Sequence, residues 1–312
     1  MNQALLAQTI SNLEQNINDL KSILSGDTKT HSKSKTEKLS ASKTPNLVAY
    51  SMPAKELGPI PDYQSNDWPA AVDDDMIIKK TSVAEQKFRA LQIINHIKEP
   101  LNDKKILDYG CGNGLVAAEA SYSAKLAFGY DIKSDDLWLE NDKPNLVCST
   151  DPDLVKQNGP YDIIVLYDVL DHAIGQSPLN IVQMASELLA DDGVIFIRTH
   201  PWTSRTGGHT YENINKAYLH LAITPDELSQ IGIQIEPNQK IIRPMAAYEL
   251  WFKEAGLSVI DKKTKATQVE QFFSDDIIDR IIKINWGGKL DRDTARKIMA
   301  NHFIDYKLSK SK

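Results

Sequence analysis

Hydrophobic residues recur every three or four positions near the start of the chain. The repeat consists of Leu6, Ile10, Leu13, Ile17, Leu20 and Leu24. This heptad spacing is typical of an amphipathic helix that pairs with another helix, and an isoleucine–leucine seam favours dimers. It also suits a single helix docked on its own domain. We therefore expect residues 1–25 to serve self-association or docking to a protein partner.

Two stretches with few hydrophobic side chains follow this predicted helix. Residues 26–45 are mostly Ser, Thr and Lys, which predicts a disordered linker. Residues 46–80 are interrupted by prolines and favour an extended lead-in that lies across the folded domain. These prolines are Pro53, Pro59, Pro61 and Pro69.

From about residue 80 the hydrophobic pattern alternates between the helical and the strand period. Strands are predicted at 105–108, 126–130, 145–149, 161–167 and 193–198, and helices at 82–98, from 114, and at 178–190. This alternation is typical of βαβ units and a parallel sheet. Further on, we expect a helix that ends at Gly256, two strands near 257–263 and 266–273, and a helical tail over 275–312.

The segment KKILDYGCGNG, residues 104–114, ends an apolar run with an acid and then places glycines at alternate positions. Repeated glycines at a strand end indicate that a ligand approaches the backbone closely. A second acid, Asp131, ends the next predicted strand about 20 residues later, a spacing that suits hydrogen bonds to ribose hydroxyls. These two features alone fit a nicotinamide or flavin cofactor as well.

The glycine segment resembles the first motif of class I S-adenosylmethionine-dependent methyltransferases, in which an acid precedes x-G-x-G-x-G. The defined positions are Asp108, Gly110, Gly112 and Gly114. The stretch YDIIVLYDVLDHA resembles the fourth strand of the small-molecule and ubiquinone-type members. Its matching positions are Asp168, Leu170, Asp171 and His172, with Asp171 where those enzymes often have Glu.

The resemblance covers roughly residues 82–275 and implies both a fold and a cofactor. The implied fold is α/β: a doubly wound, mostly parallel seven-stranded sheet in the order 3-2-1-4-5-7-6, with the last strand antiparallel and helices on both faces. The implied cofactor is S-adenosylmethionine, with its amino group near the first acid and its ribose near the second. The residues expected to bind it are Asp108, Gly110, Cys111, Gly112, Asp131, Ile132, Thr150, Asp151, Tyr167, Asp168 and His172.

The segment THPWTSRTGGHTYENINKAYLHL, residues 199–221, collects polar side chains just after the fifth predicted strand. Loops at this end of such a sheet carry substrate groups. Histidine can take a proton from an attacking oxygen or nitrogen near pH 7, although a polar loop with capping histidines would look similar. Gly207 and Gly208 would allow hinge motion or close approach. The candidate catalytic residues are His200, Arg205, His209 and Tyr211.

A metal site is not expected, although Asp168, Asp171, His172 and His200 are suitable ligand types. Asp171 and His172 are adjacent, so their side chains would diverge on a helix. The pattern of metal-dependent catechol-type enzymes after the fifth strand is also absent.

The composition of the chain limits its expected partners and cellular location. A formal net charge of -6 argues against a bulk nucleic-acid binder, despite the Lys-rich linker. The two cysteines are too few for a disulfide framework, and no apolar run is long enough for a membrane span or resembles a signal peptide. We expect a cytoplasmic protein without membrane contact.

The expected function is methyl transfer from S-adenosylmethionine to an oxygen or nitrogen of a small polar molecule. One alternative is methylation of nucleic acid or protein. Another is an assembly protein that keeps the fold and docks through residues 1–25. The expected division of the chain is a heptad helix at 1–25, a linker at 26–45, a lead-in at 46–80, a methyltransferase domain at 81–275 with a substrate insert at 199–242, and a helical extension at 276–312.

Overall fold

The structure is a computed structural model that describes residues 54–72, 82–140, 143–173, 178–232, 245–266 and 273–311. All of these residues belong to one compact unit, Leu47–Lys312. The predicted heptad helix, the linker and the start of the lead-in lie outside the described residues. None of the described helices is long and apolar enough to cross a membrane.

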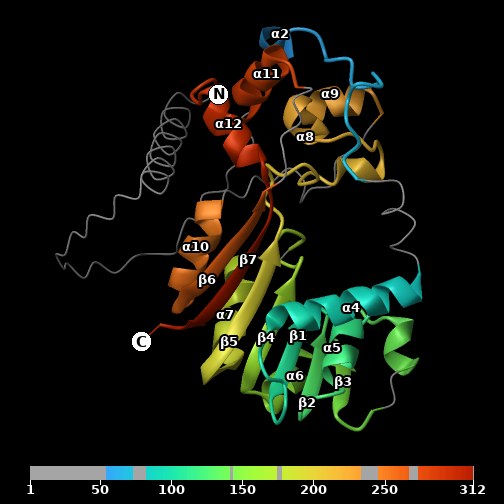
Figure 1. The fold of residues 1–312 in the computed structure, drawn as a ribbon, viewed down its shortest axis with the longest axis vertical. Coiled ribbons are helices and arrows are strands. Elements are labelled where there is room, and N and C mark those ends of the chain that lie inside the picture. Colours follow the sequence, from blue (N-terminus) through green and yellow to red (C-terminus); the bar gives the residue numbers. More distant parts are fainter. Residues whose placement is uncertain are drawn as a thin grey trace, which may run out of the picture. The chain divides into compact units, whose positions relative to one another are not determined.

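A seven-stranded sheet in the order β3-β2-β1-β4-β5-β7-β6 forms the centre of this unit (Figure 1). Strands β1 to β5 are parallel to their neighbours in this group, and β7 runs antiparallel to both β5 and β6. This confirms the expected doubly wound α/β sheet. The strands are β1 (Lys105–Tyr109), β2 (Leu126–Tyr130), β3 (Leu146–Ser149), β4 (Tyr161–Tyr167), β5 (Leu189–Thr199), β6 (Leu257–Ala266) and β7 (Asn301–Lys310).

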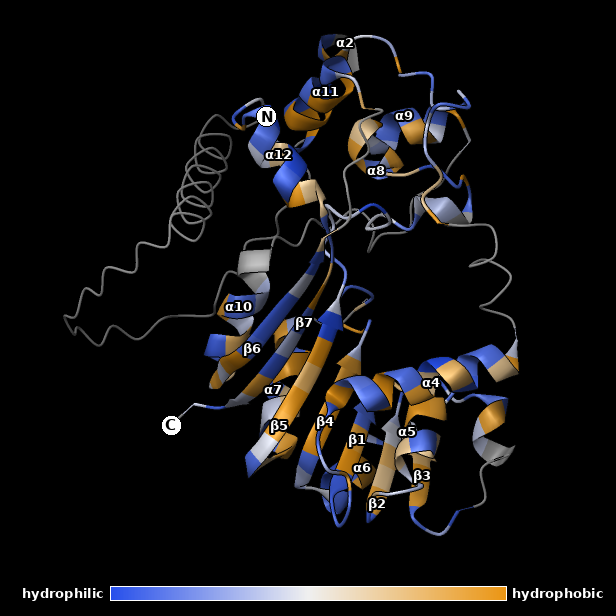
Figure 2. Ribbon diagram, in the orientation of Figure 1, coloured by the Kyte–Doolittle hydropathy of each residue, from blue (hydrophilic) through white to orange (hydrophobic). Residues whose placement is uncertain are grey.

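Helices cover both faces of the sheet. One face packs against α4 (Val83–Ile97) and α5 (Leu115–Ala120), and the other against α6 (Pro152–Asn158), α7 (Pro178–Leu188) and α10 (Met245–Glu254). Central strands with both faces covered read as continuous hydrophobic runs, as the colouring of β4 and of the middle of β5 shows in Figure 2. The edge strand β6 is exposed after its first residue, and its polar colouring follows from this.

The C-terminal region departs from the prediction of a helical tail. Helices α11 (Asp275–Trp286) and α12 (Arg292–Met299) form as expected, but the next ten residues are β7, which lies inside the sheet. The described partner of β6 is β7, and residues 267–272 of the second strand expected at 266–273 lie outside the described part. The helical prediction was wrong for 301–310 because the pairing that stabilises β7 comes from strands distant in sequence.

Three segments that are far apart in the sequence build a second apolar core beyond the end of β5. We call them the helical subdomain. The indole of Trp68 donates to the carbonyl of Ala217 at 2.8 Å, so the described part of the lead-in packs against residues 200–232, and residues 54–57 of it are helical rather than extended. The subdomain comprises residues 54–72 with α2 (Ala54–Leu57), residues 200–232 with η2 (Thr210–Glu212), α8 (Leu219–Ala222) and α9 (Pro225–Gln230), and α11 with α12.

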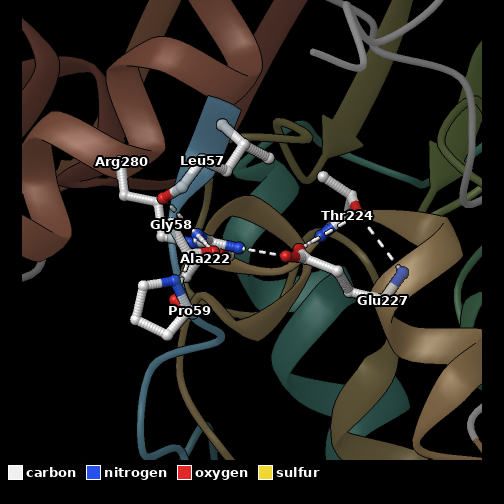
Figure 3. A network of polar contacts seen from close by, with 7 residues as sticks. All are labelled: Leu57, Gly58, Pro59, Ala222, Thr224, Glu227 and Arg280. Atoms are coloured by element: carbon white, nitrogen blue, oxygen red, sulfur yellow. Dashed lines mark hydrogen bonds and ion pairs between the residues drawn. The ribbon is translucent and has the colours of Figure 1, made fainter. Parts of the chain in front are cut away.

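A buried ion pair joins these three segments (Figure 3). Arg280 of α11 lies 2.5 Å from a carboxylate oxygen of Glu227 in α9, and both side chains are almost fully buried. The same guanidinium donates to the carbonyls of Leu57 and Ala222, each at 2.8 Å. Glu227 also accepts from the backbone amide of Thr224 at 2.9 Å, which completes a capping box at the start of α9. One guanidinium thus fixes the end of α2 and the start of α9 on α11.

Candidate active site

The loop between β1 and α5 bends sharply at three glycines. Gly110, Gly112 and Gly114 have φ angles of 79°, 51° and 74°, which side chains other than glycine rarely adopt. The backbone amides of Gly110 and Cys111 both donate to the carbonyl of Tyr130, at 2.7 and 2.9 Å. The loop is therefore held against the end of β2.

The first two glycines serve different purposes. A Cβ atom at Gly110 would lie 2.6 Å from Cγ2 of Val169, so this glycine lets the loop pack against the turn that follows β4. A Cβ atom at Gly112 would meet no described atom within 4 Å. Gly112 therefore borders open space, where a ligand can approach the backbone.

Asp108, at the end of β1, is a buried carboxylate beside this loop. Its Oδ2 atom has no hydrogen-bond partner among the described residues. Burial raises its pKa to about 7, with a further small rise from the charge of Asp131. An unpartnered buried carboxylate is costly unless a cation or donor meets it. The ammonium group of S-adenosylmethionine has the required charge, so this side chain fits the expected cofactor.

Asp131, at the end of β2, is fixed on the glycine loop. Its Oδ2 accepts from the amide of Gly112 at 2.8 Å, and its Oδ1 accepts from the amide of Lys133 at 3.2 Å. The next side chain, Ile132, is 72% exposed and offers an apolar surface beside the carboxylate. The indole of Trp138, in η1 (Asp136–Glu140), donates to the carbonyl of Gly112 at 2.8 Å. This arrangement suits a ribose and a flat base.

Three other residues expected at the cofactor have structural partners. Asp151 caps α6 by accepting from the amide of Asp153 at 2.9 Å, and Thr150 beside it is exposed. The hydrogen bond with Cys148 and burial raise the pKa of the Cys111 thiol, so this thiol stays protonated. The ring of Tyr167 lies under the Arg198 guanidinium, 4.8 Å from its centroid, on the α4 side of the sheet.

Asp168 follows β4 in a left-handed conformation, with φ of 55°. Its Oδ2 lies 2.6 Å from Arg89 of α4, and its Oδ1 lies 3.3 Å from Nε2 of His200. Burial opposes ionisation of Asp168, but His200 and the charge of Arg89 outweigh it and lower the pKa to about 2. Asp168 is therefore a permanent anion between two basic side chains. Arg89 had no motif around it that could have marked it in the sequence.

His200 lies at the end of β5 between two acceptors. Its Nδ1 is 3.2 Å from the carbonyl of His302, and its Nε2 faces Asp168. Burial disfavours the charged ring, but Asp168 outweighs it and raises the pKa of His200. Burial and the charge of His200 lower the pKa of His302 to about 4. His302 was missed because it follows α12, about a hundred positions further along the chain.

A second group of side chains surrounds the turn after β4. Asp171 is buried, and burial together with Asp168 raises its pKa. The ring of His172 meets the ring of His209 edge-on, with centroids 4.4 Å apart, and Tyr211 lies 5.8 Å from His209. The structure therefore brings His209 and Tyr211, from the loop after β5, to the turn after β4.

The remaining candidates in this loop hold the helical subdomain together. The Nε atom of Arg205 donates to the carbonyls of Ala70 and Ala71, each at 3.0 Å, so Arg205 anchors the lead-in. A Cβ atom at Gly207 would lie 2.2 Å from a carbonyl oxygen of Trp202, and one at Gly208 2.3 Å from the side chain of His220. The two glycines are required for close approach of neighbouring segments, the second of the two roles expected for them.

Known proteins resemble this chain in sequence. A family model described as a methyltransferase domain matches residues 84–262. A ubiquinone biosynthesis O-methyltransferase of Glaesserella parasuis is 31% identical over 121 residues, which are 35% of this chain and 50% of that protein. A protein of the same name from Vibrio atlanticus is 26% identical over 178 residues, 51% of this chain and 69% of its own. The chain thus spans about half the length of the first of these relatives.

Among solved structures, one similar chain is an S-adenosylmethionine-dependent methyltransferase described as putative, from Listeria monocytogenes. It is 14% identical, covers 72% of this chain and 98% of its own, and has a TM-score of 0.47. The family model alone covers more than half of the present chain, and it includes the glycine loop and the strands that carry the acids. This protein therefore belongs to the methyltransferase domain family, the S-adenosylmethionine-dependent methyltransferases of class I.

Proposed function

We propose that this protein transfers the methyl group of S-adenosylmethionine to an oxygen or nitrogen atom of a small polar molecule. The proposal rests on the close packing of Gly110 against Val169. A Cβ atom added at Gly110 would lie only 2.6 Å from Cγ2 of Val169. This contact places the cofactor loop beside the turn that leads to Asp171 and His172. A methyl donor on the loop would therefore lie next to acidic and imidazole groups.

The residues have separate roles in this proposal. Asp108 would pair with the ammonium group of the cofactor, Asp131 would accept from its ribose, and Ile132 would cover its base. S-adenosylmethionine supplies the electrophilic methyl group, and the protein contributes orientation and proton transfer. The attacking atom must lose a proton, and the turn after β4 offers groups that accept one.

A small acceptor fits the charge of this region better than a nucleic acid does. The carboxylates of Asp108, Asp131, Asp168 and Asp171 gather at the carboxyl ends of neighbouring parallel strands. Arg89 and His200 already pair with Asp168, so the basic groups at these strand ends are engaged, whereas binding of a phosphate backbone depends on basic contacts. The relatives are O-methyltransferases, which supports an oxygen acceptor without identifying the molecule.

Radiolabelled S-adenosylmethionine and a size-fractionated cell extract test the proposal directly. Label is expected in the small-molecule fraction with the wild-type protein, and not with an Asp108→Asn variant that fails to bind S-adenosylhomocysteine. Label in protein or nucleic acid would contradict the proposed acceptor class. Absence of label from every fraction, with cofactor binding intact, would favour the assembly-protein alternative.

A further inference from the structure

Asp171, His172 and His209 form a group at the turn after β4, beside the glycine loop. Each offers one ligand atom, and these three atoms lie within 4.8 Å of one another. The sequence argued against such a group, because neighbouring side chains diverge on a helix. In the structure residues 170–172 form a turn instead, in which the amide of His172 donates to the carbonyl of Val169 at 3.2 Å. The turn lets the side chains of Asp171 and His172 point to the same place.

The buried carboxylate of Asp171 is the main indication of a ligand in this group. Its side chain is 8% exposed, and neither carboxylate oxygen has a hydrogen-bond partner among the described residues. Nε2 of His172 is 3.8 Å from its Oδ2, too far for a hydrogen bond. Buried carboxylates are normally paired, or they coordinate a metal. The group therefore offers a buried carboxylate and two imidazoles as ligands for a cation.

His209 reaches this group from the other side. It has a φ of 54°, and its amide donates to the carbonyl of Thr206 at 2.9 Å, so a tight turn presents its ring to His172. The rings of the two histidines meet edge-on at 4.4 Å. A residue held in the left-handed region usually has a structural or functional reason to be there.

We propose that Asp171, His172 and His209 bind a divalent transition-metal ion of the zinc type. Two imidazoles and one carboxylate are the ligand set of many catalytic zinc sites, whereas Mg²⁺ and Ca²⁺ prefer oxygen ligands throughout. Bonds of this length in a tetrahedral site place ligand atoms about 3.3 Å apart. The three side chains must therefore close slightly on the ion, and the half-exposed ring of His172 has room to turn.

The ion would also act on the acceptor, a consequence that rests on the proposed function. Three protein ligands leave a coordination position open, as in catalytic rather than structural zinc sites. A hydroxyl group bound there would lose its proton to solvent more readily, because the metal stabilises the resulting oxyanion, and the three side chains would then act as ligands and not as proton acceptors. The contact of Gly110 with Val169 keeps this position next to the cofactor loop.

The test uses the full-length protein after treatment with a chelator. Titration calorimetry with Zn²⁺ should show one site of high affinity, and Co²⁺ should give the visible absorption of a nitrogen- and oxygen-coordinated ion. Asp171→Asn and His209→Gln should each weaken Zn²⁺ binding at least tenfold, in keeping with the loss of a ligand. His96→Gln is the matched control, because His96 contacts Asp305 outside the group. It should bind Zn²⁺ like the wild type.

Binding of S-adenosylhomocysteine shows that each variant is folded and separates this proposal from the proposed function. If Zn²⁺ binds but no methyl transfer occurs, the proposed metal site is supported and the proposed methyltransferase activity is not. Wild-type Zn²⁺ affinity in both Asp171→Asn and His209→Gln would overturn the site and point to the thiols of Cys111 and Cys148. Absence of saturable Zn²⁺ binding, or binding of Mg²⁺ alone, would also overturn it.

Discussion

Nε2 of His200 lies 3.3 Å from Oδ1 of Asp168, across the ends of the neighbouring parallel strands β4 and β5. The other ring nitrogen, Nδ1, lies 3.2 Å from the carbonyl oxygen of His302. The contact with Asp168 is an ion-pair distance, and the charge of this carboxylate favours the protonated ring and raises the pKa of His200. A protonated His200 ring therefore stabilises Asp168, and the role of His200 as a proton acceptor stays a prediction.

Removing the charge of Asp168 should lower the pKa of His200. The raised pKa means that His200 contributes stability below its unfolded value of about 6.5, and that this contribution is lost as the pH rises through the folded pKa. In the Asp168→Asn variant, the dependence of stability on pH that His200 contributes should disappear. A proton NMR titration of the ring measures the change, with the exposed Asp153→Asn as control. An unchanged His200 pKa would show that the pair is not coupled.

Gly112→Ala should abolish cofactor binding at a cost in stability no larger than that of a matched glycine elsewhere. The new methyl group would enter open space that the cofactor needs, and the left-handed backbone adds about 1–2 kcal/mol of strain. Gly256→Ala is the matched control, since it has a φ of 71° and an equally open surrounding far from the loop. Calorimetry with S-adenosylhomocysteine and urea unfolding of both variants separate the two effects. Equal binding by both would place the cofactor elsewhere.

Gly110→Val would not separate loss of the cofactor's space from loss of the loop's structure. Any side chain at Gly110 collides with Val169, so loss of binding there could follow from a displaced loop rather than from a filled site.

Cofactor affinity should rise between about pH 5 and pH 8 because Asp108 has to ionise to meet an ammonium group. Its pKa is raised from 3.8 to about 7. In the cofactor-free protein the folded state binds more protons than the unfolded state in this window, so the free energy of unfolding should fall as the pH rises from about 4 to about 7. Binding at pH 6 should release protons, which calorimetry in buffers of different ionisation enthalpy detects. Asp108→Asn should bind weakly with no proton release.

Glu227→Gln should strongly destabilise the protein. The substitution leaves the buried guanidinium of Arg280 without its counterion, and breaking a buried pair from one side costs about 3–5 kcal/mol. Arg292→Gln breaks contacts with Asp275 and Asp279 that are exposed, so solvent screening should make its cost much smaller. Urea unfolding measures both. Similar losses in the two variants would mean that solvent reaches the Arg280 pair.

The amino-acid sequence by itself determined the local parts of this protein. Strands β2 and β4 occupy the residues predicted for them, because their apolar runs are bounded by turn and helix signals. The glycine loop and Asp108 were recognisable for the same reason: the whole motif lies within eleven consecutive positions. Such features depend on neighbours in the chain, which a sequence displays directly.

Only the tertiary structure decided which distant segments meet. The strand β7 alternates its buried side chains, but its place between β5 and β6 depends on partners that precede it by dozens of residues or more. The contact of Arg89 with Asp168 and that of His209 with His172 likewise join separate elements. Whether two such side chains meet depends on how whole elements pack and on turns such as residues 170–172. Packing is set by the burial of apolar surface from the entire unit, so no single stretch of sequence contains it.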